Sequence, residues 1–348
     1  MCGYNIFNKL LGCIDEINYH TKKRGPDLTN IENINNITFI HNLLHITGKQ
    51  TKQPFKKNNI VCIFNGEIYN YKTFGDYESD GYCLIDLYEK YGINFTKYLD
   101  GEFSISLIDF NKNIILLSTD IFSTKPLFYS FNNNVFMISS YHICIQKNCI
   151  KKYKQLDANK TIIFDLKTFE KIEETNIHNF DLKQYKNTFN DWNKAWEKAI
   201  KKRTNTDKNI FVPLSSGYDS GSICCALNNL DIKYETYTVL GQEDKNTLVG
   251  RFKKNNVKCN NYILDNKIVQ TYREKNKKEL FDYSFYPVKR RPKDIYNVLR
   301  DGASPGINFL FEKASNNNMK IMLSGQGADE ILADYGFNGQ KKTWHSSF

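Results

Sequence analysis

The chain has 348 residues, 41% of them hydrophobic and 14% aromatic, which predicts two folded domains and excludes a disordered polymer. Its formal net charge of +10 raises nucleic acid as a partner, but lysines interleaved with asparagines favour a solvated surface or a coding bias. No run of about 18 apolar residues and no leader pattern is visible, so we expect neither a membrane span nor a signal peptide. Nine cysteines without a CxxC pair predict a reducing, cytoplasmic location, with Cys224 and Cys225 in a helical core.

The N-terminus contains a candidate nucleophile. Removal of Met1 would leave Cys2 with both a thiol and a free α-amine. An amine of pKa ~7.7–8.0 can accept the thiol proton, which places a nucleophile and its base in one residue. A free thiol without a catalytic role is the alternative, so Cys2 needs support from the rest of the chain.

Three later segments provide such support. Arg24–Asp27 (RGPD) is a rigid, charged turn, and Ile60–Asn70 (IVCIFNGEIYN) is an apolar strand that runs into an Asn-Gly pair. A side-chain amide and a glycine N–H side by side can form an oxyanion hole for thiol attack on an amide. Ser79 and Asp80 then precede a helix expected over residues 82–91. Each segment alone is also consistent with ordinary turn or cap chemistry.

Together and in this order, these segments resemble the class II glutamine amidotransferase domain of the asparagine synthetase family. The resemblance implies an αββα sandwich of the Ntn-hydrolase type over residues 1–185, with strands at 100–109 and 120–129. It also implies that Cys2 attacks the side-chain amide of glutamine while Asn65 and Gly66 hold the oxyanion. The glutamine-binding residues that it implies are Leu43, Leu44, His45, Ile46, Thr47, Asn65, Gly66, Glu67 and Asp80.

One departure from the family concerns recognition of the substrate carboxylate. Members of the family carry an arginine where this chain has Leu43. Losing a bidentate carboxylate contact costs about 2–5 kcal/mol of binding energy. We therefore expect either weak glutamine binding or a substitute basic residue.

A boundary is expected near residues 183–190, before a helix that carries an aromatic stripe. Phe189, Trp192, Trp196 and Ile200 recur at helical spacing, which favours a core or a domain interface over a ligand cage.

The second half is organised around Leu214–Gly221 (LSSGYDSG). An apolar strand precedes this loop and a short buried helix follows it, so loop amides and the helix N-terminus can bind a phosphate. Asp219 could hold a magnesium ion that bridges the phosphates. An ordinary turn between a strand and a helix is the alternative.

The loop resembles the SGGxDS loop of the PP-loop ATP-pyrophosphatases, with Ser216 in place of the first glycine. Pro213 fits only if it ends its strand. A second glycine-rich loop, Ser324–Glu330 (SGQGADE), follows another predicted strand. The resemblance implies a doubly wound parallel α/β domain over residues 186–348 that uses ATP and Mg²⁺, the metal being held by Asp219 and Asp329. The ATP-binding residues that it implies are Leu214, Ser215, Ser216, Gly217, Asp219, Ser220, Val239, Ser324 and Gly325.

Two further departures concern this second half. Gln326 replaces a glutamate of the family, and the chain stops at Phe348, so the ATP domain is expected to be shortened relative to the family.

The resemblance as a whole implies a glutamine-dependent, ATP-using amidotransferase that converts aspartate, glutamine and ATP to asparagine, glutamate, AMP and pyrophosphate. The alternatives are an enzyme of the same family with another small carboxylate as acceptor, or a catalytically impaired ATP-binding module. Glutamine and a small carboxylate are the expected partners. Nucleic acid and membrane are not, and a homodimer is left open.

Overall fold

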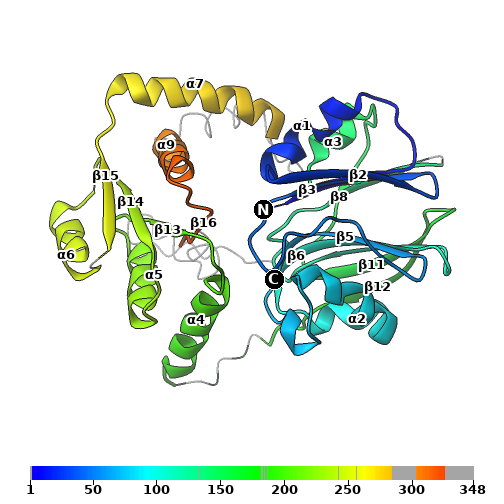
Figure 1. The fold of residues 1–348 in the computed structure, drawn as a ribbon, viewed down its shortest axis with the longest axis horizontal. Coiled ribbons are helices and arrows are strands. Elements are labelled where there is room, and N and C mark those ends of the chain that lie inside the picture. Colours follow the sequence, from blue (N-terminus) through cyan, green and yellow to red (C-terminus); the bar gives the residue numbers. More distant parts are fainter. Residues whose placement is uncertain are drawn as a thin grey trace. The chain divides into compact units, whose positions relative to one another are not determined.

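The computed structural model describes residues 2–132, 134–181, 183, 185, 187–241, 243–255, 257–283 and 303–325. The chain divides into two compact units, one built on Met1–Tyr185 and the other on Lys186–Phe281 with later residues. We describe each unit by itself (Figure 1). Within the described residues, no helix is both long enough and apolar enough to cross a bilayer.

The first unit contains two six-stranded antiparallel sheets (Figure 1). One sheet has the order β10-β8-β9-β1-β3-β2, with strands Lys154–Gln155, Phe128–Asn132, Val135–Ser139, Gly3–Phe7, Ile37–Leu43 and Leu28–Ile34. The other has the order β12-β11-β7-β6-β5-β4, with strands Lys171–Asn176, Lys160–Asp165, Ile114–Thr119, Gly101–Asp109, Ile60–Ile68 and Phe55–Lys57.

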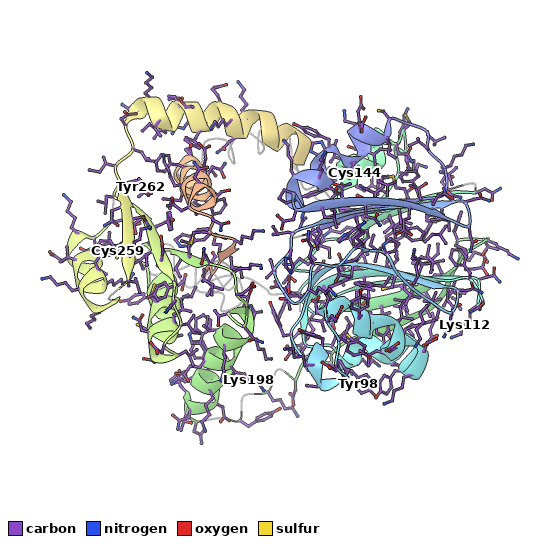
Figure 2. All side chains as sticks on the ribbon, in the orientation of Figure 1. Tyr98, Lys112, Cys144, Lys198, Cys259 and Tyr262 are labelled. Carbon is purple, nitrogen blue, oxygen red and sulfur yellow. The ribbon has the colours of Figure 1, made fainter. Side chains whose placement is uncertain are left out.

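Alternating side chains build three apolar layers around these sheets. Ile6 and Ile63 lie in the core between the two sheets, whereas Phe7 packs on the outer side with helices α1 (Ile14–Arg24) and α3 (His142–Lys147). Phe64 points to the other outer side, where α2 (Cys83–Tyr91) covers the second sheet. Successive residues of a strand face opposite sides of the sheet, so β1 and β5 each contribute to two layers. The unit is therefore an αββα sandwich, and the predicted fold class is confirmed for this half. Its interior is filled with side chains, including Cys144 of α3 (Figure 2).

The strand predicted at residues 100–109 is present as β6, but the one predicted at 120–129 is wrong over most of its length. Strand β8 begins only at Phe128. Asp120 is 3% exposed, and its carboxylate accepts hydrogen bonds from the N–H groups of Phe103 at 2.9 Å and Phe122 at 2.9 Å. A side chain that binds nearby backbone amides in this way stabilises a turn in place of a strand.

The second unit contains a four-stranded parallel sheet of order β15-β14-β13-β16. Its strands are Lys258–Tyr262, Glu235–Val239, Ile210–Pro213 and Ile321–Met322. Its helices are α4 (Asn190–Arg203), α5 (Tyr218–Asn229), α6 (Lys245–Asn255), α7 (Asn266–Tyr283) and α9 (Ala303–Asn316).

Helices cover both faces of this parallel sheet. Val212 of β13 packs with side chains of α4, α5 and α6, whereas Phe211 packs with α7 and α9. The strand order reverses next to β13, because β14 lies on one side of it and β16 on the other. The predicted doubly wound fold is confirmed, and such a reversal is where open α/β sheets place their ligands. Pro213 is the last residue of β13, as the sequence requires.

Two predicted sets of core side chains are only partly buried. Along α4 and its N-cap, Ile200 is buried and Trp196 packs against the same core, but Phe189 is 81% and Trp192 is 54% exposed, and the predicted alternative of a domain interface stays a prediction. In α5, Cys224 is buried whereas Cys225 is exposed, because adjacent helical residues point in different directions.

Candidate functional site

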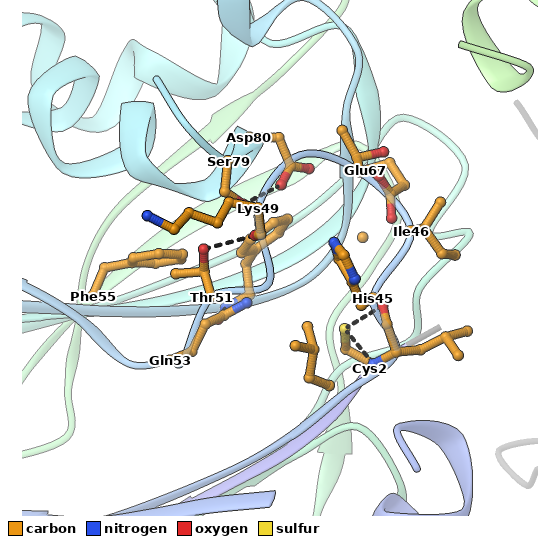
Figure 3. Close-up of a pocket in the computed structure, with 15 residues that line it drawn as sticks. Cys2, His45, Ile46, Lys49, Thr51, Gln53, Phe55, Glu67, Ser79 and Asp80 are labelled. Atoms are coloured by element: carbon orange, nitrogen blue, oxygen red, sulfur yellow. Dashed lines mark hydrogen bonds between the residues drawn. The ribbon is translucent and has the colours of Figure 1, made fainter. Parts of the chain in front are cut away.

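The first unit has a pocket of about 350 Å³, including the space at its opening (Figure 3). We call it the Cys2 pocket. It brings together most of the predicted glutamine site, from the segment before β1, the chain after β3, the end of β5 and the turn before α2. The predicted residues that line it are Cys2, Leu43, Leu44, His45, Ile46, Thr47, Gly66, Glu67 and Asp80. Their individual roles stay predictions.

Cys2 lies in the wall of this pocket and is 7% exposed. Its Sγ accepts a hydrogen bond from the N–H of Leu44 at 3.4 Å and lies 3.7 Å from the carbonyl oxygen of the same residue (Figure 3). Burial raises the pKa of the Cys2 thiol to about 11. The group is therefore a neutral thiol at pH 7, and nucleophilic attack requires a base.

The RGPD turn helps to order the pocket wall opposite β5. The Asp27 carboxylate accepts a hydrogen bond from the N–H of His45 at 2.9 Å, and the His45 ring contacts the carbonyl oxygen of Gly48 at 2.7 Å. Arg24 lies over the ring of Tyr141, 4.9 Å from its centroid. The turn therefore positions the segment that carries Leu43–Thr47.

Gly66 has a backbone conformation that other residues rarely adopt. Its φ is +153°, and a Cβ atom at this position would lie 2.0 Å from the carbonyl oxygen of Glu102 on β6. Any side chain would push β5 and β6 apart, so the close approach of the two strands requires glycine here. Its N–H is one of the two oxyanion donors that the sequence predicts.

Asn65, the other predicted donor, does not line the pocket. Strand alternation directs its side chain into the space between the sheets, the same side as Ile63. The Asn65 side chain is 0% exposed, and neither Nδ2 nor Oδ1 has a hydrogen-bond partner among the described residues. An unpaired amide in a protein interior is costly unless a ligand or water binds it. This buried amide can therefore still accept a hydrogen bond from water or a ligand group, or donate one to it.

Two carboxyl groups give the pocket its acidic character. Burial, and after it the charge of the neighbouring Asp80, raises the pKa of Glu67 to about 8. Burial raises the pKa of Asp80 to about 6, against the lowering effect of a hydrogen bond from the N–H of Ile68 at 2.9 Å. The pair therefore keeps a proton to higher pH than two free carboxyl groups would. Such a pair is suited to bind a cationic group such as a substrate ammonium.

The position of the expected family arginine is apolar in the structure as well. Leu43 is 8% exposed. The basic side chains that line the pocket in the described structure are His45 and Lys49, and Lys49 pairs with Glu78 at 3.1 Å on the surface. No described cation therefore takes the buried position that an arginine at 43 would have.

Gln53 is a pocket residue that the sequence analysis missed. It is 3% exposed, and its Oε1 accepts a hydrogen bond from the N–H of Phe64 at 2.8 Å. Its sequence neighbours (KQTKQP) are polar and carry no periodic signal, so nothing in the pattern distinguishes it from a surface glutamine.

The second candidate site is the loop Leu214–Gly221, which connects β13 to α5. The hydroxyls of Ser215 and Ser220 lie 3.0 Å apart, and the N–H groups of Ser215 and Gly217 bind Ser220 Oγ and Ser215 Oγ, both at 3.1 Å. Helix α5 has 12 residues and no side-chain cap at Gly217. Uncapped amides of the first helical turn are suited to bind an anion.

An acidic and a basic side chain already contact this loop. The Glu243 carboxylate accepts two hydrogen bonds from Ser216, one from the backbone N–H at 2.5 Å and one from the side-chain hydroxyl. Arg251 of α6 donates to the carbonyl oxygens of Gly217, at 2.8 Å, and Ser215. Neither residue was predicted as part of the site. Glu243 thus binds the backbone N–H and the hydroxyl of Ser216, a predicted ATP-binding residue.

The second glycine-rich loop meets the first one at Asp219. A Cβ atom on Gly325 would lie 2.3 Å from Cβ of Asp219, so Gly325 packs directly against it. Val239 ends β14 and packs against the α7 and α9 side of the sheet. Ser324 precedes Gly325, whereas Gln326 and Asp329 lie outside the described residues.

The residues for magnesium are only partly described. Asp219 is exposed at the start of α5, beside the second loop. Among the residues that the structure describes, no group of three or more His, Cys, Asp or Glu side chains gathers in a metal-binding arrangement. A carboxylate next to a phosphate loop fits Mg²⁺, which is usually bound by one or two carboxylates, water and substrate phosphates.

Comparison with known sequences gives the same two regions. The family described as glutamine amidotransferase domain matches residues 1–183, and the family described as asparagine synthase matches residues 191–348. A Methanocaldococcus jannaschii protein with a provisional name as an asparagine synthetase (glutamine-hydrolyzing) is 28% identical over 92% of this chain. The mouse asparagine synthetase (glutamine-hydrolyzing) is 25% identical over 90% of the chain. The chain spans 62% of the length of each of these two relatives.

Two solved structures were also found to be similar. The allosteric regulatory enzyme of purine biosynthesis aligns with 76% of this chain and 80% of its own, at 10% identity and a TM-score of 0.40. The NH3-dependent NAD synthetase from Campylobacter jejuni aligns with 43% of this chain and 63% of its own, at 16% identity and a TM-score of 0.28.

Proposed function

We propose that this chain, which belongs to the glutamine-hydrolysing asparagine synthetase family, releases ammonia from glutamine in its first unit and uses ATP to join it to a carboxylate in its second. Residues 1–185 would form the amidotransferase domain and residues 186–348 the ATP domain. The observation that carries the proposal is the convergence of Cys2, the Gly66 amide and two buried carboxyl groups in one pocket.

In the first unit, the Cys2 sulfur would attack the side-chain carbonyl carbon of glutamine. The α-amine that removal of Met1 exposes would take the thiol proton, because the raised pKa of Cys2 makes a base necessary. The Gly66 N–H and the Asn65 amide would stabilise the oxyanion. Breaking the C–N bond releases ammonia and leaves a thioester, which water hydrolyses to glutamate and free Cys2.

Substrate recognition in this pocket would depend on the amine end of glutamine. Glu67 and Asp80 would bind its ammonium group, and His45 to Thr47 would close the other side. Because residue 43 is a leucine, the wall of the Cys2 pocket offers no positive charge there to the α-carboxylate of glutamine. We therefore expect a KM for glutamine higher than an arginine at this position would give, by about tenfold or more.

In the second unit, ATP would bind with its phosphates on the first loop and on the Ser324-Gly325 turn. Leu214, Ser215, Ser216, Gly217, Asp219, Ser220 and Val239 are the other proposed contacts. Mg²⁺ on Asp219, with Asp329 from outside the described residues, would neutralise phosphate charge. A carboxylate oxygen of the acceptor would attack the α-phosphorus, pyrophosphate would leave, and ammonia would then displace AMP to form the amide.

Aspartate is the proposed acceptor, with asparagine as the product. Gln326 favours a second candidate, another small carboxylic acid, since a glutamine cannot act as the acid, base or charged acceptor ligand that a glutamate provides. A wholly different outcome is a protein that binds ATP without forming an amide.

Two assays on the full chain test the proposal. Glutamate release should depend on Cys2, and a Cys2→Ala variant that releases glutamate as fast as wild type would remove the assignment. ATP–pyrophosphate exchange should be stimulated by aspartate. Stimulation by another acid alone would favour the second candidate. If the protein binds ATP but no acid stimulates the exchange, the result would favour a protein that only binds ATP.

A further inference from the structure

Within the described part of the chain, no strand covers the edge of β5 next to the Cys2 pocket. Strand β4 pairs with β5 only from Ile60 to Cys62. Beyond that point, Phe64, Gly66 and Ile68 direct their N–H groups towards the open edge, because alternate residues of a strand present their backbone groups to the same side. The pairing with β6 agrees with this. Phe103 lies opposite Gly66 on β6, and its N–H and carbonyl oxygen bind Asp120, on the side of β6 that faces away from β5. The backbone groups of Gly66 therefore face away from β6.

Side chains satisfy the first and the third of these edge amides. The N–H of Phe64 donates to Gln53 Oε1 at 2.8 Å, and the N–H of Ile68 donates to Asp80 Oδ2 at 2.9 Å. The Gly66 N–H lies between them on the pocket wall, and no described residue supplies an acceptor for it. Two side-chain anchors thus flank the proposed oxyanion donor on the same strand edge.

Gln53 is itself held in place. Its backbone carbonyl oxygen accepts a hydrogen bond from Asn30 Nδ2 on β2 at 2.8 Å, and the residue is 97% buried. The carboxamide is neutral, so it anchors Phe64 without adding a third acidic group to a pocket that contains Glu67 and Asp80. A negative charge here would oppose both the Cys2 thiolate and the oxyanion.

We propose that Gln53 is a positioning residue for thioester formation at Cys2, acting by fixing the β5 edge so that the Gly66 N–H reaches the oxyanion. The inference rests on the proposed glutaminase function. Oxyanion donors work only within a narrow range of distances, and displacements of about 1 Å can reduce rates about 100-fold. Without the Gln53 acceptor, Phe64 would turn its N–H towards water and move Gly66 with it.

The test compares glutamine hydrolysis with a reaction of Cys2 that forms no oxyanion. Gln53→Met keeps the length of the side chain but removes the acceptor. We expect kcat for glutamine to fall about 30–100-fold, with KM changed less than threefold. Alkylation of Cys2 by iodoacetamide, a displacement at a saturated carbon, should keep its wild-type rate within about twofold.

Two further variants complete the design. Gln53→Glu, assayed at pH 6, where a buried carboxyl group is largely neutral, keeps an acceptor oxygen and should recover most of kcat. Asn148→Leu is the matched control, since it removes a fully buried carboxamide that accepts from the N–H groups of Leu11 at 2.7 Å and Gly12 at 3.1 Å in the same unit. It should lower thermal stability and leave kcat unchanged.

The outcomes separate the inference from the function on which it rests. If wild type hydrolyses glutamine through Cys2 and Gln53→Met does so equally fast, the positioning role is wrong and the function stands. An equal loss of alkylation and hydrolysis in Gln53→Met, or no recovery in Gln53→Glu, would make Gln53 merely structural. Absence of Cys2-dependent hydrolysis in wild type overturns both.

Discussion

The two carboxyl groups of the Cys2 pocket hold protons to unusually high pH. Burial and the neighbouring Asp80 raise the pKa of Glu67 to about 8. A substrate ammonium nearby lowers such a pKa by about 1–3 units, so glutamine binding at pH 7 should release protons from Glu67. Calorimetric titration of a Cys2→Ala variant in two buffers of different ionisation enthalpy measures this, and Glu67→Gln should abolish the buffer dependence.

The same shift predicts a pH dependence of stability. Because burial raises the pKa of Glu67 from 4.5 to about 8, the folded state binds more protons than the unfolded state between these values. This group therefore stabilises the fold fully below about pH 4.5, and the contribution is lost as the pH rises through about 8. Glu67→Gln should flatten the unfolding free energy over this range. A profile unchanged by the substitution would contradict the assignment.

Glu243 is the residue through which the second site can be tested most directly. Its carboxylate accepts hydrogen bonds from the Ser216 N–H and hydroxyl, the donors to which the phosphates of ATP are proposed to bind. Glu243→Ala should free these donors and remove a negative charge, which we expect to tighten ATP binding about tenfold, or ~1.4 kcal/mol. Asp244→Ala is the control, because that neighbouring carboxylate instead accepts from the N–H of Thr247 at 2.6 Å. Weaker ATP binding in Glu243→Ala would make Glu243 a ligand of the site and not its competitor.

At the scale of elements, the close approach of β5 to β6 depends on Gly66. Gly66→Ala would place a methyl group against the Glu102 carbonyl, so we expect a loss of several kcal/mol in stability and of glutaminase activity. Gly92→Ala is a matched comparison: φ is also positive, +57°, but no atom lies within 4 Å of the added Cβ. It should cost only about 1–2 kcal/mol in chemical denaturation, with activity kept. An equal loss of unfolding free energy in the two variants would show that the contact between β5 and β6 does not require glycine at position 66.

At the scale of the whole molecule, each unit has its own hydrophobic core. Within the described residues, the three core clusters of the sandwich and the two of the parallel sheet share no side chain. A fragment of residues 1–185 should therefore fold alone, unfold in a single cooperative transition and keep Cys2-dependent glutamine hydrolysis. Circular dichroism and a glutaminase assay measure this. A fragment without a cooperative transition would mean that the sandwich needs the second unit.

The sequence by itself determined the fold class of both units through its family resemblance, because short motifs and hydrophobic periodicity are local properties that need no tertiary contact. The strand–loop–helix pattern around Leu214–Gly221 predicted a phosphate-binding loop, and the resemblance of that loop to the PP-loop enzymes implied the doubly wound sheet. Only the tertiary structure decided that Asp120 makes a turn, since its carboxylate accepts hydrogen bonds from the N–H of Phe103, 17 residues away, as well as from that of Phe122. The same holds for Gln53 and Glu243, whose neighbours in sequence carry no pattern and whose partners lie 11 and 27 residues away. The protonation of Glu67 likewise follows from burial in the folded chain, which no local pattern of residues records.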